Sequence, residues 1–143
     1  MSDSNAENRV GYVLKRAQHA LRTTMDSKLD TLGLTTSQYA ALSALENDEG
    51  LANAALARKC FVTPQTMYRI VRGLREGGLI EQSAHPTHGR KKQLHLTEDA
   101  VELLAEAHRV VGRVEAEMTG DLDAREREEL IRMLEACLSG LEA

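Results

Sequence analysis

The sequence predicts a mainly α-helical protein with one small β-hairpin. Apolar residues recur at three-and-four spacing along most of the chain, which is the period of amphipathic helices. The segment from Leu79 to Leu96 instead holds two strand-like runs around turn residues at Pro86 and Gly89, and the second run alternates apolar Leu94 and Leu96 with polar residues. The length of 143 residues and a hydrophobic fraction of 42% suit one domain without a membrane span. We therefore expect residues 1–143 to form a single domain.

Two helices are expected first. The stretch from Val10 to Leu29 repeats at helical spacing and ends near Gly33. The next helix begins after Thr35, whose spacing to Gln38 makes a capping box. The repeating residues of the first helix are Val10, Leu14, Ala17, Leu21, Met25 and Leu29, and the inward stripe of the second is Tyr39, Leu42 and Leu45.

A pair of short helices follows the turn at residues 48–50. The first covers Asn53 to Cys60. The second begins at Thr63, which can cap a helix, and Pro64, which loses no hydrogen bond at a first helical position. Its inward face is Met67, Ile70, Val71 and Leu74, and its outer face is Gln65, Thr66, Arg69 and Arg72. Such polar groups can pair with base edges in a major groove, although any soluble amphipathic helix shows a polar outer face.

The hairpin favours a nucleic-acid role for that helix. Strand-like runs at residues 79–82 and 91–96 flank a basic tip, where a phosphate backbone or a narrow minor groove could receive positive charge. The basic residues of this tip are Arg90, Lys91 and Lys92. A helix pair followed by a basic hairpin predicts a winged helix-turn-helix over residues 35–96.

Charge is divided unevenly along the chain. The whole sequence has a net charge of −4, yet residues 58–96 hold eight Lys or Arg against two Glu, a local charge of +6. The remainder is therefore acidic, at −10. Binding to phosphates depends on the face that meets the DNA, so this asymmetry is the expected footprint of a DNA-binding segment.

Two further helices complete the chain. One runs from Thr97 to about Thr119, and Asp123 with Glu126 caps the other. The stripe of the former is expected to be Val101, Leu104, His108, Val111 and Met118. The stripe of the latter is Leu130, Met133, Leu134, Cys137, Leu138 and Leu141, which is too wide for a small monomer to leave in water. We therefore expect residues 7–32 and 97–143 to form dimerisation helices with a second copy.

Parts of this pattern resemble the MarR family of bacterial transcriptional regulators. The resemblance lies in residues 56–66 and 74–80, in Gly89-Arg90 and in Leu96-Thr97. It implies a winged helix-turn-helix regulator, most often a repressor, that reads a palindromic operator as a homodimer. Three positions depart from the family: His88 replaces an Asp of the wing, Phe61 stands where glycine is common, and Ala52 stands where Ser or Thr caps a helix. Asn53 is the expected substitute cap.

The DNA-binding residues can be assigned as a hypothesis. Base edges are assigned to Gln65, Thr66 and Arg69, phosphates to Thr63, Arg72 and Arg75, and the minor groove to Arg90. The full expected set is Thr63, Pro64, Gln65, Thr66, Tyr68, Arg69, Arg72, Arg75, Arg90, Lys91 and Lys92.

The resemblance also implies release from DNA by a small aromatic or phenolic effector. The candidate pocket residues are Arg16, His19, Tyr39 and His108, since an anionic ligand needs a cation or donor inside an apolar cleft. Each of them also fits the ordinary role of a solvated or satisfied side chain.

Other modes of sensing have weaker support. Cys60 and Cys137 fall on apolar faces without a CxxC spacing, which favours buried thiols over a redox sensor. His85, His88 and His95 lack a nearby cysteine or carboxylate cluster, so solvated histidines are favoured over zinc ligands, and no metal or cofactor is expected.

Other classes of protein fit less well. The sequence has no nucleophile elbow, phosphate loop or HExxH motif, so no enzyme is expected. A helical dimeric adaptor is the remaining rival, but it would not need the basic residues of the wing and helix. The polar, acidic N-terminus has no secretion leader, so a cytoplasmic location is expected.

Overall fold

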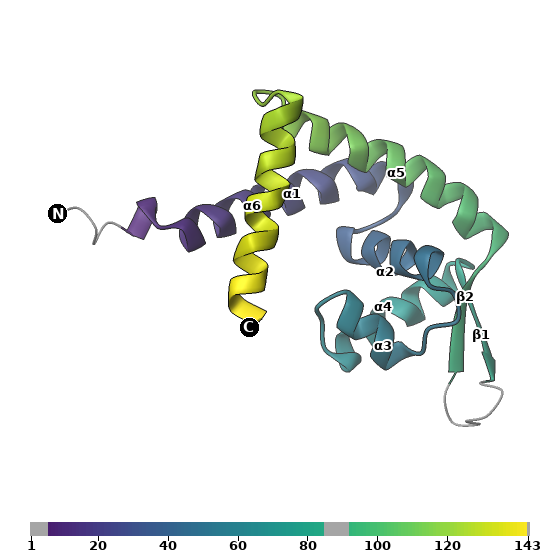
Figure 1. Cartoon of the computed structure of the whole chain (residues 1–143). Helices are drawn as coiled ribbons and strands as arrows, with labels where there is room; N and C mark the ends of the chain where they lie inside the picture. The colour runs from purple at the N-terminus through teal and green to yellow at the C-terminus, as the bar shows by residue number, and fades with distance from the viewer. Residues whose placement is uncertain (1–5, 85–91, 143) are drawn as a thin grey trace.

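The computed structural model describes residues 6–84 and 92–142 (Figure 1). It is mainly helical with one two-stranded antiparallel sheet, which confirms the predicted fold class. The elements in order are η2 Ala6–Asn8, α1 Val10–Leu29, η3 Asp30–Leu32, α2 Thr36–Asn47, α3 Asn53–Lys59, α4 Pro64–Glu76, β1 Ile80–Ala84, β2 Lys92–Leu96, α5 Glu98–Met118 and α6 Ala124–Glu142.

Helices α2, α3 and α4 share one apolar core with the hairpin. Each contributes side chains at the helical spacing predicted from the sequence, and β2 adds Leu94 from its inward face. The largest fully buried members of this core are Leu42, Leu45, Leu56, Met67, Leu74 and Leu94. Tyr39 and Ile70, which were expected inside, are only partly buried and pack against its edge. The elements that would read DNA therefore rest on a continuous core.

Local caps fix where α2 begins. The Gln38 backbone N–H donates to Thr35 Oγ1 at 3.1 Å, and the Thr35 backbone N–H donates to Gln38 Oε1 at 2.9 Å, which is the predicted capping box. Gly33 lies in the left-handed region at φ 73°, where glycine avoids the clash that a Cβ would meet. Asp26 of α1 accepts a bond from the Thr36 backbone N–H at 2.7 Å, so α1 and α2 are joined at this corner.

The hairpin has a simple register, with Ile80 opposite Leu96 and Gln82 opposite Leu94. Its base is also bonded to the loop before α3. The Gly50 N–H donates to the Leu94 carbonyl, and the Leu94 N–H donates to the Leu51 carbonyl, each at 3.0 Å. This short segment therefore continues the sheet beyond its two assigned strands.

Helices α1 and α5 lie side by side above the winged domain (Figure 1). Val101 and Met118, at the two ends of the stripe predicted for α5, are 50% and 51% exposed in the single chain. The face that packs inward is instead Ala100, Leu104, Ala107, Val111 and Val114. Small alanines occupy two of these places, so their burial was not evident from hydrophobicity alone.

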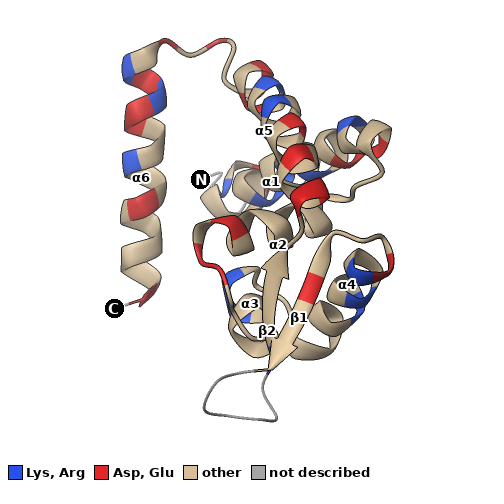
Figure 2. Cartoon of the chain, turned by 90° about the vertical axis from the view of Figure 1, so that its right-hand side faces the viewer, with Lys and Arg blue, Asp and Glu red and all other residues tan. Residues whose placement is uncertain are grey.

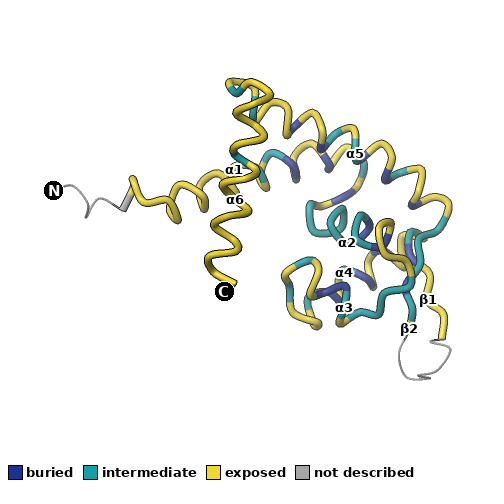
Figure 3. The backbone as a smooth tube through the Cα atoms, in the orientation of Figure 1, coloured by how far each residue is buried: buried dark blue, intermediate teal, exposed yellow. Residues whose placement is uncertain are grey.

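The first half of α1 and all of α6 contribute nothing to the core (Figure 3). Val10 is 74% exposed and Leu14 is 49% exposed in the single chain, although both belong to the apolar repeat of the helix. None of the residues of α6 from 124 to 142 is buried, and the helix stands apart from the body in Figure 2. Among the described helices, none is both long and apolar enough to cross a bilayer.

Candidate nucleic-acid interface

Helix α4 begins at a well-formed cap. Thr63 Oγ1 accepts from the Thr66 backbone N–H at 3.1 Å, and Pro64 occupies the first turn, as predicted. Asn53 does not cap α3, because its position is the first residue inside that helix. Its side-chain amide instead donates to the Pro64 carbonyl at 3.0 Å. Asn53 therefore fastens α3 to the start of α4, a role that the sequence did not indicate.

The two faces of α4 are separated as expected. Met67, Val71 and Leu74 are at most 3% exposed. On the other side Gln65, Arg69 and Arg72 are exposed, and Tyr68 is 62% exposed. The arginine positions of α4 are blue along its ribbon in Figure 2. The helix thus presents amide, phenol and guanidinium groups to solvent from a rigid support.

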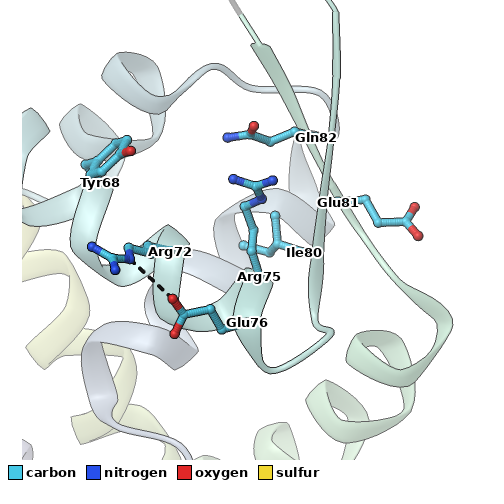
Figure 4. A pocket seen from close by; sticks show the side chains of 7 residues that line it. All are labelled: Tyr68, Arg72, Arg75, Glu76, Ile80, Glu81 and Gln82. Carbon is cyan, nitrogen blue, oxygen red and sulfur yellow. Dashed lines mark hydrogen bonds and ion pairs between the residues drawn. The ribbon is translucent and has the colours of Figure 1, made fainter.

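An open cleft of about 640 Å³ lies between α4 and strand β1 (Figure 4). Arg75 points across it toward Gln82, while Glu81 points away on the other side of the strand. The residues that line it are Tyr68, Arg72, Arg75, Glu76, Ile80, Glu81 and Gln82. Two guanidinium groups in one open cleft suit a phosphate group, because phosphate accepts several charge-assisted hydrogen bonds.

Ion pairs reduce this positive charge only in part. Arg72 Nε lies 3.2 Å from Glu76 Oε1, but both side chains are about 70% exposed (70% and 69%), so the pair stabilises little and can open toward a phosphate. Lys59 of α3 lies 3.5 Å from Asp48, also at the surface. Both ion pairs lie at the surface, so the charges of Arg72 and Lys59 are not buried.

The predicted basic residues of the wing are only partly described. Lys92 is exposed at the start of β2, opposite Ala84. Arg90 and Lys91 lie outside the described residues, as do His85 and His88. Within the described parts of the chain, no group of three His, Cys, Asp or Glu side chains is arranged to hold a metal ion. His95 instead shares a 3.0 Å hydrogen bond with the Ser83 hydroxyl.

The four candidate effector residues do not form one site in a single chain. Tyr39 and His108 do meet: the Tyr39 hydroxyl and His108 Nδ1 are 2.7 Å apart, and His108 Nε2 is 2.8 Å from Glu46 Oε1. Burial raises the pKa of the Tyr39 hydroxyl, and nearby carboxylates add to the rise. Arg16 and His19 lie on the exposed part of α1, where the Arg16 guanidinium is 5.9 Å from the centre of the Tyr12 ring. The bonded group Tyr39–His108–Glu46 links α2 to α5.

The cysteines are placed differently from each other. Cys60 is half-buried, and burial raises the pKa of its thiol, which keeps it protonated and poorly nucleophilic. Cys137 is exposed on α6, contrary to the expectation of a buried thiol on an apolar face. That face of α6 is uncovered in the single chain.

A capped helix held against a second helix, with a two-stranded hairpin beside it and a basic cleft between them, defines a winged helix-turn-helix DNA-binding protein. The MarR family model matches residues 32–91. The HTH-type transcriptional repressor Rv2887 of Mycobacterium tuberculosis is 35% identical over 126 residues, which cover 88% of this chain and 91% of that protein. The chain belongs to the MarR family of transcriptional regulators.

Two solved structures have the same fold. The crystal structure of Rv2887 in complex with salicylic acid has a TM-score of 0.76 at 33% identity, covering 92% of this chain and 98% of that one. The transcriptional repressor CouR bound to a 23-mer DNA duplex has a TM-score of 0.87 at 25% identity, covering 94% of this chain and 96% of that one. The similarity therefore extends over the helices on both sides of the winged domain.

Proposed function

We propose that the protein is a repressor that binds a palindromic operator as a homodimer and leaves it when a small aromatic ligand binds. The observation that carries this proposal is the exposed polar face of α4 beside the basic cleft. The repressor named among its relatives and the DNA-bound structural neighbour support it. We place this regulator in the cytoplasm, because its target is DNA. We propose no catalytic role for it.

Residue roles follow from position on α4. We assign Gln65, Thr66 and Arg69 to base edges, because they are on the outer face near the start of the helix. The Thr63 hydroxyl donates to the Thr66 oxygen at 3.0 Å, so the Thr66 hydroxyl keeps its own hydrogen for a base acceptor.

The remaining cations are assigned to the backbone of the DNA. Arg72 and Arg75 line the cleft between α4 and β1 and suit one phosphate, with Tyr68 of the same cleft as a hydroxyl donor. Thr63, the cap of α4, is assigned to a phosphate at the start of the helix. Arg90 is assigned to the minor groove, and Lys91 and Lys92 to phosphates beside it.

A second copy of the chain is the proposed cover for α6. This helix presents apolar side chains that are 43% to 88% exposed, and the first half of α1 does the same. The residues concerned on α6 are Ile131, Met133, Leu134, Leu138 and Leu141. A two-fold dimer would bury them and would place two copies of α4 about 10 bp apart, one for each half of a palindrome.

The proposed effector is a small aromatic acid or phenol. The Rv2887 complex with salicylic acid supports this class. Tyr39 and His108 lie at the junction of α2 and α5, where a ligand that takes over their mutual hydrogen bond would change how the winged domain sits on α5. A thermal shift with salicylate in the native protein, absent in Tyr39→Phe, would support this location, and equal shifts in both would reject it.

The experiment that tests DNA recognition is selection of random duplexes on the purified protein. The best sequence would then compete against random DNA at physiological salt. Recovery of a palindrome with half-sites about one turn apart supports the proposal. Recovery of nothing above background, from protein that is folded and dimeric, would favour a helical adaptor instead.

A further inference from the structure

Phe61 combines two features that are each unfavourable for an isolated chain. Its φ is 58°, the only positive φ of a residue other than glycine among those the structure describes. The residue is also 94% exposed, more than any other exposed large hydrophobic residue of the described chain. A side chain in the left-handed region is strained, and an exposed ring gains nothing from burial. Glycine would avoid both costs, so a benefit from outside the folded chain would explain the phenylalanine.

The backbone around Phe61 keeps the ring turned outward. The Phe61 N–H donates to the Arg58 carbonyl at 3.3 Å, and the Val62 N–H donates to the Ala57 carbonyl at 3.1 Å. On either side, Cys60 and Val62 are partly buried and pack against the core. Turning the ring inward would require breaking these bonds and displacing both neighbours. The exposure is therefore built into the turn between α3 and α4.

The surroundings of Phe61 point to DNA as the partner. The residue lies two positions before Thr63, the cap of α4, and follows the exposed cations Arg58 and Lys59. A turn with this charge suits a polyanion better than an apolar protein surface. The apolar residues assigned to a second copy lie elsewhere, on α1 and α6.

We propose that Phe61 contacts the C5 methyl group of a thymine at the edge of the major groove and so gives each half-site a thymine preference at that position. This inference rests on the proposed function. A thymine methyl group is the apolar feature that a base pair presents in the major groove, and phenylalanine is among the side chains that contact it. The start of a recognition helix is the part that approaches base edges, and Phe61 adjoins it.

The test uses uracil, which lacks only the methyl group of thymine. Each thymine of the selected operator is replaced in turn, in both half-sites together, and affinity is measured by fluorescence anisotropy for the native protein and Phe61→Gly. At one thymine position the native protein should lose about fourfold per half-site, the value of one buried methyl group. Phe61→Gly should bind the parent operator more weakly and should not respond to that replacement.

Two controls separate the ring from other effects. Arg72→Ala removes a proposed phosphate contact, so it should weaken binding to the parent operator and still respond to uracil. Phe61→Gly should unfold at the same temperature as the native protein or a higher one, because glycine relieves the strained φ. If the variant binds DNA more weakly while its stability is unchanged or greater, the loss of affinity is caused by loss of the Phe61 ring.

Three outcomes would overturn the inference while leaving the proposed function in place. Equal affinity of Phe61→Gly and the native protein would show that the ring does not contact DNA. A uracil response that persists in Phe61→Gly would assign the methyl contact to another residue. A change in oligomeric mass on removing the ring would place Phe61 at an interface between protein chains. Failure of the native protein to prefer any operator over random DNA would reject the proposed function itself, and the inference with it.

Discussion

The winged domain and helix α6 use apolar residues in opposite ways. In the winged domain, leucines such as Leu45 and Leu56 are fully buried and support α4 from within. On α6, leucines of the same helical spacing are exposed, and Leu141 is 88% exposed. Leucine side chains thus stabilise the fold in the winged domain, whereas on α6 they are left for a partner chain to cover. A single chain can therefore form the DNA-reading face of α4 by itself, but it cannot bury the apolar face of α6.

The largest contrast is expected from one leucine in each region. Leu45→Ala should lower the free energy of unfolding by about 2–5 kcal/mol, because it leaves a cavity in a closed core. Leu141→Ala, at an 88% exposed position, should cost no more than about 0.5 kcal/mol within the single chain. Urea denaturation at a protein concentration below that at which the chains dimerise measures both. Equal losses would show that α6 belongs to the same cooperative core.

The next effect is on assembly. Leu138→Glu on α6 would place a carboxylate in the proposed dimer interface, where an unpaired charge costs far more than in water. We expect dimer affinity to fall by at least about a hundredfold while the winged domain stays folded. Analytical ultracentrifugation measures the dimer affinity, and circular dichroism measures whether the winged domain stays folded. The control is Ser139→Glu, which adds the same charge beside the apolar stripe. A monomeric native protein at micromolar concentration would contradict the dimer.

A smaller effect is expected on the outer face of α4. Gln65→Ala should reduce discrimination between operator variants by about 1–3 kcal/mol, because a base contact is lost. Arg75→Ala should weaken binding to all sequences and lower the slope of log affinity against log salt by about one. Titrations at several salt concentrations distinguish these results. If both variants lost affinity equally on every sequence, the division into base and phosphate contacts would be wrong.

The smallest effect is expected where α1 meets α2. The Thr36 hydroxyl lies near Asp26 and the Thr36 N–H donates to it, and these lower the pKa of the carboxyl below its ordinary value of 3.8. A lowered pKa in the folded state adds stability above pH 3.8, and this is lost as the pH falls below that value. Asp26→Asn should therefore reduce stability by less than about 1 kcal/mol at pH 7. Thermal unfolding from pH 2 to pH 7 should show the difference vanish in acid, whereas a constant difference would assign it to packing.

Much of the fold could be predicted from the sequence because the signals are local. Thr35 with Gln38, Thr63 with Pro64, and Asp123 with Glu126 mark helix starts through residues only three apart or fewer. The two strand-like runs on either side of Pro86 and Gly89 likewise indicate the hairpin, although not its register. These features depend on short-range hydrogen bonds that any chain with the same residues would form.

The rest depends on contacts between distant residues. The bond from Asn53 to Pro64 joins two helices, and the pairing of Tyr39 with His108 joins residues 69 apart in the chain. Both roles were missed, since spacing along one helix says nothing about what faces it. The exposure of Val10 and Leu14 in the single chain has a different cause. Periodicity reports that a face is apolar, and it does not report which chain covers it.

The hydrogen bonds that Gly50 and Leu51 make with Leu94 fix the position of the wing relative to the loop before α3. Because the loop before α3 is hydrogen-bonded to β2, the wing is held directly against the segment that leads into the helix-turn-helix. The width of one half-site is then set inside each chain, and the gap between half-sites is set by how two chains meet. Operators for this protein should tolerate a changed gap more readily than a changed half-site.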